Sequence, residues 1–178
     1  MKHILSKLIF LFFINTSFAQ VSMVQYDCKE IGWSIQFPES WSVTVLDQMA
    51  EAPYENMKYP IFFQKDQSNI FQSTLTPLEI SGFEEWKGQL NSQYEILLNT
   101  YTQEGIKFDT TTKSEIINKV NFEIIEILIY NSDKDIILKQ EYYATFINGY
   151  EFSATLSYNN PESKSILKTA LSESTFKK

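Results

Sequence analysis

The strongest constraint on the fold is a pair of long apolar segments, 136–147 and 150–158, separated only by Asn148-Gly149. Asn-Gly between alternating apolar residues is the strongest short-range signal for a two-residue β-hairpin turn. The two strands joined by this turn carry apolar side chains on both faces of the hairpin. A single layer of helix can cover only one of these faces. This pattern predicts an antiparallel sheet between helices. The expected cross-strand pairs are Ile147 with Tyr150, Thr145 with Phe152, and Tyr143 with Ala154.

Two segments have the periodicity of covering helices. Residues 82–103 carry one apolar stripe, with Ser81 and Glu84 in a capping-box pattern and Gly105 at the expected end. An aromatic stripe of this kind is more often part of a core than a ligand groove. The stripe consists of Phe83, Trp86, Leu90, Tyr94, Leu97 and Tyr101.

The second expected helix spans residues 161–173. Asn160 suits the N-cap and Pro161 the first helical position. Phe176 is expected to pack back against the sheet. The apolar face of this helix is formed by Ile166, Leu167, Ala170 and Leu171.

The remaining strands are expected on either side of the first helix. Residues 122–130 are apolar on both faces apart from Glu123 and Glu126, which is typical of a central strand covered on both sides. Residues 47–60 are expected to form a loop. The other expected strands are 33–37 and 41–46 as an opening hairpin, 61–65 and 69–75 around a turn at 66–68, and 111–117, which reaches 122–130 through Lys119-Val120.

The fold class that follows is α+β, with an antiparallel sheet of about six to seven strands sandwiched between helices (α/β/α). No linker or repeat divides the chain, so residues 20–178 are expected to form a single domain.

The first nineteen residues have the pattern of a signal peptide. Lys2 and Lys7 precede an apolar run over residues 8–14, and Ser17 and Ala19 are small residues at the positions read for cleavage. The run is much shorter than the roughly 20 residues that span a bilayer, which disfavours the alternative of an N-terminal membrane anchor. The protein is therefore expected to be exported, to a periplasmic or extracellular location of a bacterium, with no integral membrane anchor after cleavage.

Composition excludes several kinds of chemistry. The only histidine, His3, lies in the expected signal, and the chain has no arginine. Histidine-dependent nucleophilic catalysis and imidazole metal ligation are therefore excluded from the exported part. That part carries 13 lysines against 22 acidic residues, a net charge of −9, which disfavours nucleic acid as a partner.

Cys28 is the only cysteine, so an intrachain disulfide is impossible. A packed, unreactive thiol near the start of the first strand is favoured over a free reactive or intermolecularly bonded one.

The acidic residues give no complete site. Asp133 and Asp135 flank a turn and could hold a calcium ion weakly, but a full calcium loop needs more oxygen ligands. Glu79, Glu84 and Glu85 suit the start of the first helix. Glu123 and Glu126 interrupt a buried strand, yet residues three apart on a strand point to opposite faces, so they are not expected to act as a pair.

The chain resembles the PsbP-like superfamily, which includes photosystem II accessory, Ran nucleotide-release and DcrB-like members. The resemblance rests on the segment 32–41 (GWSIQFPESW), the long middle helix, the closing hairpin through Asn148-Gly149, and the ending 174–176. It covers nearly all of the chain after the signal and implies an α/β/α sandwich. Members share architecture rather than one activity, so no functional residue is transferred.

These observations favour an exported, non-catalytic accessory or binding protein over an enzyme. No catalytic, cofactor-binding or metal-binding residue is assigned, no cofactor is expected, and the expected partner is an unknown protein in the cell envelope or outside the cell. One alternative is a carrier of a small apolar ligand in an aromatic-lined cavity. The other, less favoured, is a hydrolase based on carboxylates.

Overall fold

The computed structural model describes residues 22–44 and 61–177. The expected signal peptide and the whole of the expected loop over 47–60 lie outside these residues. The elements in chain order are β1 (Met23–Cys28), β2 (Trp33–Pro38), β3 (Ser42–Thr44), β4 (Phe62–Gln64), β5 (Ile70–Pro77), α1 (Phe83–Gln103), β6 (Lys107–Ile117), β7 (Val120–Tyr130), β8 (Ile136–Ile147), β9 (Tyr150–Tyr158), α2 (Pro161–Glu173) and β10 (Thr175–Phe176).

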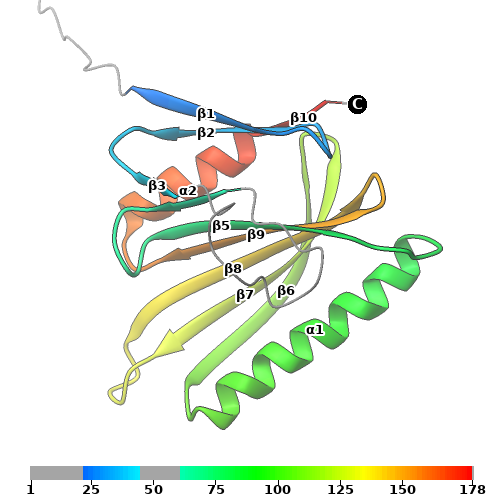
Figure 1. The fold of residues 1–178 in the computed structure, drawn as a ribbon. Coiled ribbons are helices and arrows are strands. Elements are labelled where there is room, and N and C mark those ends of the chain that lie inside the picture. The colour runs from blue at the N-terminus through cyan, green and yellow to red at the C-terminus, as the bar shows by residue number, and fades with distance from the viewer. Residues whose placement is uncertain (1–21, 45–60, 178) are drawn as a thin grey trace, which may run out of the picture.

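A seven-stranded antiparallel sheet forms the centre, in the order β3-β4-β5-β9-β8-β7-β6. The long helix α1 lies across one face, and α2 lies on the other side beside a second sheet of three strands (Figure 1). The predicted α+β sandwich is therefore confirmed. The three-stranded sheet, in the order β1-β2-β10, is an addition that the sequence did not predict.

The predicted closing hairpin is confirmed in its register. Ile147 lies opposite Tyr150 and Tyr143 opposite Ala154, with Asn148 and Gly149 both at positive φ. Both faces are buried as expected, since Phe152 and Leu156 enter one core and Ala144 and Phe146 contact the other.

The main core lies between the central sheet, β2 and α2. Its aromatic side chains pack on one another, with ring centroids 3.8 Å apart for Phe37 and Phe63 and 4.7 Å apart for Trp33 and Phe152. Phe176 joins them from β10, 5.9 Å from Phe122, as predicted. A smaller core on the opposite face holds the stripe of α1 against Ile125, Ile127 and Ala144.

The predicted opening hairpin is wrong. β2 and β3 lie in different sheets, because the chain turns at Pro38, where its carbonyl accepts from the Trp41 amide at 3.0 Å, and β3 then pairs with β4. The partner of β2 is β1, which the sequence analysis did not recognise as a strand. Cys28 consequently ends the first strand rather than starting it.

Two local predictions also need correction. The turn between β6 and β7 is Asn118-Lys119, with φ of 46° and 68°, rather than Lys119-Val120, so β7 begins at Val120, before the expected residue 122. β6 ends at Ile117 as predicted but begins at Lys107 instead of residue 111. The N-cap of α1 is Gly82, without a side-chain cap. The carboxylate that bonds back to Ser81 is that of Glu85 rather than Glu84, since Glu85 occupies the third helical position.

The ends of the helices otherwise follow the sequence. Gly105 lies just beyond α1 at φ 72°, a left-handed conformation that glycine adopts without strain. The Asn160 side chain accepts from the Ser163 amide at 2.8 Å, and Pro161 opens α2. Gly32, at φ 63°, lies so close to the Lys177 carbonyl that any side chain there would collide with it. Gly32 thus allows the chain end to approach β2.

Candidate functional site

The two carboxylates that interrupt β7 lie on opposite faces of the sheet, as predicted. Glu123 faces α1, where it accepts from Lys87 at 2.8 Å and from the Ser114 hydroxyl at 2.9 Å. Glu126 lies on the face of α2 and forms an ion pair with Lys113. Each carboxylate has its own partners, so the geometry does not bring them together as an acid–base pair.

The other acidic candidates lie in a local turn or at the exposed start of α1. Asn131 Oδ1 accepts from the amides of Asp133 and Asp135, both at 2.9 Å, which closes the turn they were expected to form. Glu79 and Glu84 are exposed near the start of α1. Within residues 22–44 and 61–177, no three His, Cys, Asp or Glu side chains are grouped so as to hold a metal ion.

Cys28 is buried and forms no disulfide. Burial, together with the nearby Glu30 carboxylate, raises the pKa of its thiol to about 11. The thiolate is the nucleophilic form of cysteine, so this thiol is unreactive at neutral pH. The packed state agrees with the interpretation favoured from the sequence.

Two buried carboxylates were missed by the sequence analysis. Glu141 accepts from Tyr158 at 2.5 Å, from Lys168 at 2.6 Å and from Tyr143 at 2.7 Å. Burial disfavours its charged form, but these three hydrogen bonds together outweigh burial and lower its pKa. The signal was available, because Glu141 lies two residues before Tyr143 and thus on the face already predicted to be buried.

Glu151 is the second, and it faces α1. It accepts from the Trp86 indole at 2.9 Å and more weakly from Gln93 at 3.4 Å. Burial raises the pKa of Glu151, since these two neutral donors only partly offset the loss of water. Both buried carboxylates therefore serve as acceptors in hydrogen bonds that join a helix to the sheet.

The aromatic residues do not enclose a ligand cavity in the main core. Trp33, Phe63 and Phe71 are almost fully buried by one another and by neighbouring apolar side chains. This packing gives no support to an aromatic-lined ligand cavity within the main core.

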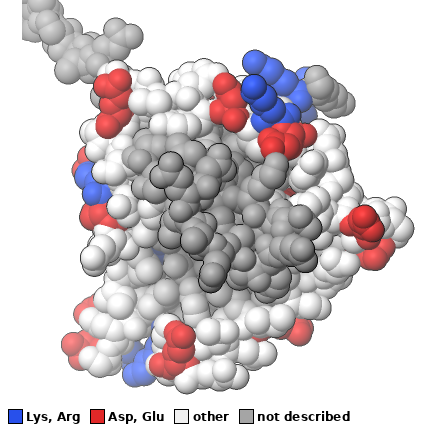
Figure 2. Space-filling model, in the orientation of Figure 1, with Lys and Arg blue, Asp and Glu red and all other residues white. Residues whose placement is uncertain are grey.

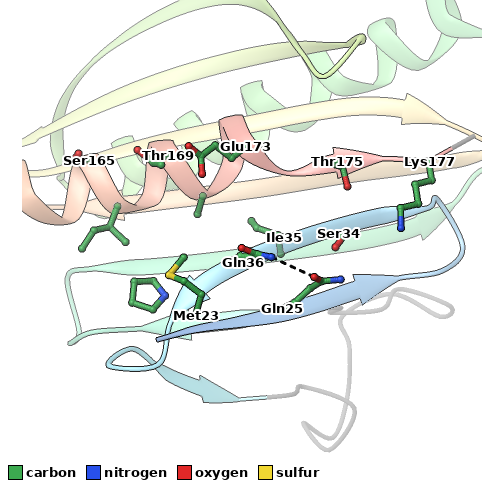
Figure 3. A pocket seen from close by; sticks show the side chains of 13 residues that line it. Met23, Gln25, Ser34, Ile35, Gln36, Ser165, Thr169, Glu173, Thr175 and Lys177 are labelled. Carbon is green, nitrogen blue, oxygen red and sulfur yellow. Dashed lines mark hydrogen bonds between the residues drawn. The ribbon is translucent and has the colours of Figure 1, made fainter. Parts of the chain in front are cut away.

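A groove of about 430 Å³ runs between β2 and α2 (Figure 3). Its size lies within the range of roughly 300–1,000 Å³ found for small binding sites. Gln36 and Met23 line one wall, and Ser165, Ile166 and Thr169 line the wall formed by α2. Glu173 and Lys177 supply the charges, and the rest of the lining is neutral.

The groove follows a strand edge that is only partly paired. β1 pairs with all six residues of β2, whereas β10 pairs only with Trp33 and Ser34 on the other edge. Within the described part of the chain, no strand pairs with residues 35–38 on that edge. The unpaired backbone faces α2 across the groove.

Two hydrogen bonds fix which residues of β2 point toward the groove. The Glu39 amide donates to Ser22 on the side of β1, and Gly32 accepts from Lys177 on the side of β10. Successive residues of a strand point their backbone groups to alternate neighbours. Trp33, Ile35 and Phe37 therefore bond toward β1, while the N–H and C=O of Gln36 point into the groove. The continuous register of β1 with β2 carries this alternation along the whole strand.

The Gln36 side chain leaves this backbone accessible. Its amide nitrogen donates to Oε1 of Gln25 on the neighbouring β1 at 3.3 Å (Figure 3). This site could not be predicted from the sequence. Apolar and polar side chains alternate over residues 33–37 in the same way whether the strand pairs with one neighbouring strand or with two.

Comparison with known proteins identifies the architecture. No protein-family model matches the chain, and no curated protein sequence does. The solution structure of cyanobacterial PsbP (CyanoP) from Synechocystis sp. PCC 6803 superposes with a TM-score of 0.66 at 10% identity, covering 90% of this chain and 96% of that one. The fold is PsbP-like. This confirms the resemblance inferred from the sequence.

A second structural neighbour is larger. A crystal structure of a protein from Bacteroides thetaiotaomicron at 1.50 Å resolution superposes with a TM-score of 0.53 at 9% identity. The match covers 86% of this chain but 48% of that one, so this chain corresponds to about half of that structure.

The described residues contain no helix that is both long and apolar enough to cross a membrane. On the face drawn in Figure 2, acidic and basic side chains are scattered around the periphery, and the basic ones form no continuous stripe.

Proposed function

We propose that this chain is an exported, non-catalytic accessory protein that binds an extended segment of a partner polypeptide along the open edge of β2. The observation that carries the proposal is the Gln36 backbone, whose N–H and C=O face a groove instead of another strand. Addition of a strand to such an edge is a recurring mode of peptide recognition, in which backbone hydrogen bonds supply affinity.

The chain itself illustrates the binding mode. Thr175 and Phe176 pair antiparallel with Ser34 and Trp33 on the same edge. An antiparallel segment that continues this line would exchange two hydrogen bonds with Gln36. Ser165, Thr169 and Ala170 on α2 line the groove opposite this edge with small side chains.

The lining defines the chemistry of the segment. Met23, Ile166 and Pro38 offer apolar contacts, and Ser165 and Thr169 offer hydroxyl groups. Side chains of a bound strand alternate between the two sides of the strand. The preferred partner segment is therefore uncharged, with small apolar residues at alternate positions.

Export is supported by the signal pattern of residues 1–19. The mass of the protein recovered after expression of the full chain in a Gram-negative host checks this step. Cleavage after Ala19 leaves a chain that begins at Gln20, whereas recovery of all 178 residues in the membrane fraction would support the anchor instead.

A proline substitution tests the binding mode. Gln36→Pro removes the amide that faces the groove but no bond to β1, and proline is tolerated on an edge strand. We expect peptides selected from a random phage library on the purified protein to bind Gln36→Pro at least tenfold more weakly, as measured by fluorescence anisotropy.

The matched control is Gln36→Ala, which loses the bond to Gln25 but keeps the backbone amide. Its affinity for the same peptides should stay within about twofold of the unsubstituted protein. Failure to enrich any peptide, or equal binding to both variants, would rule out strand addition at this edge.

A further inference from the structure

We propose a second binding site, where β6, β8 and α2 meet, that takes a small amphipathic carboxylate. The head of the ligand would occupy a pocket of about 190 Å³ lined by Lys113, Lys139, Lys164 and Lys168, here named the lysine pocket. The tail would lie in an adjoining apolar groove. This inference is independent of the open edge of β2.

Two of the four lysines are neutralised by the protein. Glu126 and Glu141 lie directly opposite each other on β7 and β8, an arrangement of like charges that is unfavourable by itself. Lys113 forms an ion pair with Glu126, and Lys168 forms one with Glu141 at 2.6 Å. These two pairs account for both acidic residues of the lysine pocket.

The other two lysines leave an excess of two positive charges. Neither Lys139 nor Lys164 forms an ion pair with any carboxylate in residues 22–44 and 61–177. Lys164 and Lys168 are also one turn apart on α2, where like charges repel. A bound anion would relieve this repulsion, in a chain whose overall charge is −7.

An apolar groove of about 360 Å³ continues from the lysine pocket. Lys139, Tyr158 and Lys164 line both spaces, so they mark the boundary between them. Ile136 and Ile137 line the groove and are 45% and 50% exposed, which makes them two neighbouring large apolar side chains in contact with water. The same groove includes Pro161 at the N-terminus of α2.

A bulge explains why both isoleucines line one groove. Ile129 pairs with Leu138, but the next residue, Tyr130, pairs with Ile136, so Ile137 is an extra residue in β8. Neighbouring residues of a regular strand point to opposite faces, and a bulge redirects one of them. The bulge therefore turns two apolar side chains toward a pocket rich in lysine.

These features together select the ligand class. Cations at one end bind a carboxylate, and exposed apolar side chains at the other end favour a short hydrocarbon tail over a purely ionic ligand. Octanoate is a suitable probe, because it combines both parts. The two matched probes are acetate, which lacks the tail, and octyltrimethylammonium, which carries the same tail with the opposite charge.

The test is a titration of the ¹⁵N-labelled protein followed by amide chemical shifts. Octanoate should give saturable shifts at Ile137, Lys139 and Lys164, acetate should bind at least tenfold more weakly, and octyltrimethylammonium should not saturate. Lack of saturation with octanoate, or an equal response to the cationic probe, would overturn the proposal.

A double variant tests whether the two lysines without an ion-pair partner bind the carboxylate of the ligand. The double variant Lys139→Gln, Lys164→Gln removes the two unpaired cations. Each exposed charge contact contributes modestly to the free energy of binding, so the dissociation constant for octanoate should rise by about tenfold. The control double variant, Lys107→Gln with Lys134→Gln, has the same change in net charge at exposed positions outside the lysine pocket. Equal effects of the two double variants would mean that octanoate responds only to overall charge, and would overturn the site.

Discussion

Replacement of Trp33 by alanine is expected to lower the free energy of unfolding by about 4 kcal/mol. Trp33 is almost fully buried and packs the three-stranded sheet against the central sheet. Its ring centroid lies 4.7 Å from that of Phe152 on the central sheet and 6.5 Å from that of Phe176 on β10. Alanine would leave a large cavity between the three-stranded sheet and the central sheet. The shift of the urea denaturation curve measures the loss.

Two further variants test the origin of that loss. Trp33→Phe keeps most of the apolar surface and removes an indole N–H that has no hydrogen-bond partner within the described part of the chain. It should therefore lower the free energy of unfolding much less than Trp33→Ala does. Ile96→Ala on the exposed side of α1, where the side chain is 67% exposed, should change the free energy of unfolding by less than about 0.5 kcal/mol. If Trp33→Ala costs no more than Ile96→Ala, the small sheet is not packed on the core as described.

Lys168→Met is expected to lower the free energy of unfolding by about 3 kcal/mol at neutral pH. Lys168 donates to the buried Glu141 carboxylate at 2.6 Å and also bonds to the Tyr143 hydroxyl. Methionine fills similar space but leaves Glu141 charged and buried with only two neutral donors. Urea denaturation at pH 7 measures the effect, and the same measurement at pH 4 tests its cause.

The pH dependence has a definite sign. In the unsubstituted protein the pKa of Glu141 is lower in the folded state than in the unfolded state. Ionised Glu141 therefore stabilises the fold at pH values above its unfolded-state pKa, and this stabilisation is lost as the pH falls through its folded-state pKa. Without Lys168, burial dominates and the folded pKa should rise above the unfolded one. The variant then loses stability as pH increases from about 4 toward 7, so its deficit should be smaller at pH 4.

The double variant Lys168→Met, Glu141→Gln distinguishes an unpaired charge from lost packing. Removing the carboxylate as well should restore part of the stability, because breaking one half of a buried ion pair costs more than replacing both halves. The Glu141 charge is not the cause of the lost stability if two results are found together. The double variant would be no more stable than Lys168→Met, and the loss of unfolding free energy in Lys168→Met would not depend on pH.

The central sheet was predictable because its signals are local. Asn148-Gly149 defines a turn by itself, and the stripe of residues 83–101 defines a helix with one buried face. Strand β1 was overlooked although Val24, Tyr26 and Cys28 alternate with the polar Gln25 and Asp27, since this alternation is short. With β1 missing, β2 could only be paired with the next segment, which produced the incorrect hairpin.

Neither candidate site could be predicted, because each depends on where separate elements end. The groove beside β2 exists because β10 has only two residues and pairs no further than Ser34. The lysine pocket assembles Lys113, Lys139 and Lys164 from two strands and a helix, and the distances between them along the sequence carry no sign of their proximity. Isolated lysines in the sequence look like solvated surface residues until the fold brings them together.

The most direct test of strand addition is hydrogen exchange at three neighbouring amides of β2, measured by NMR in the free protein and with a selected peptide bound. Ile35 and Phe37 bond toward β1 and should be protected in both states. Gln36 should exchange rapidly in the free protein and become protected in the complex. Protection of Gln36 in the free protein, or rapid exchange in the presence of saturating peptide, would contradict the account.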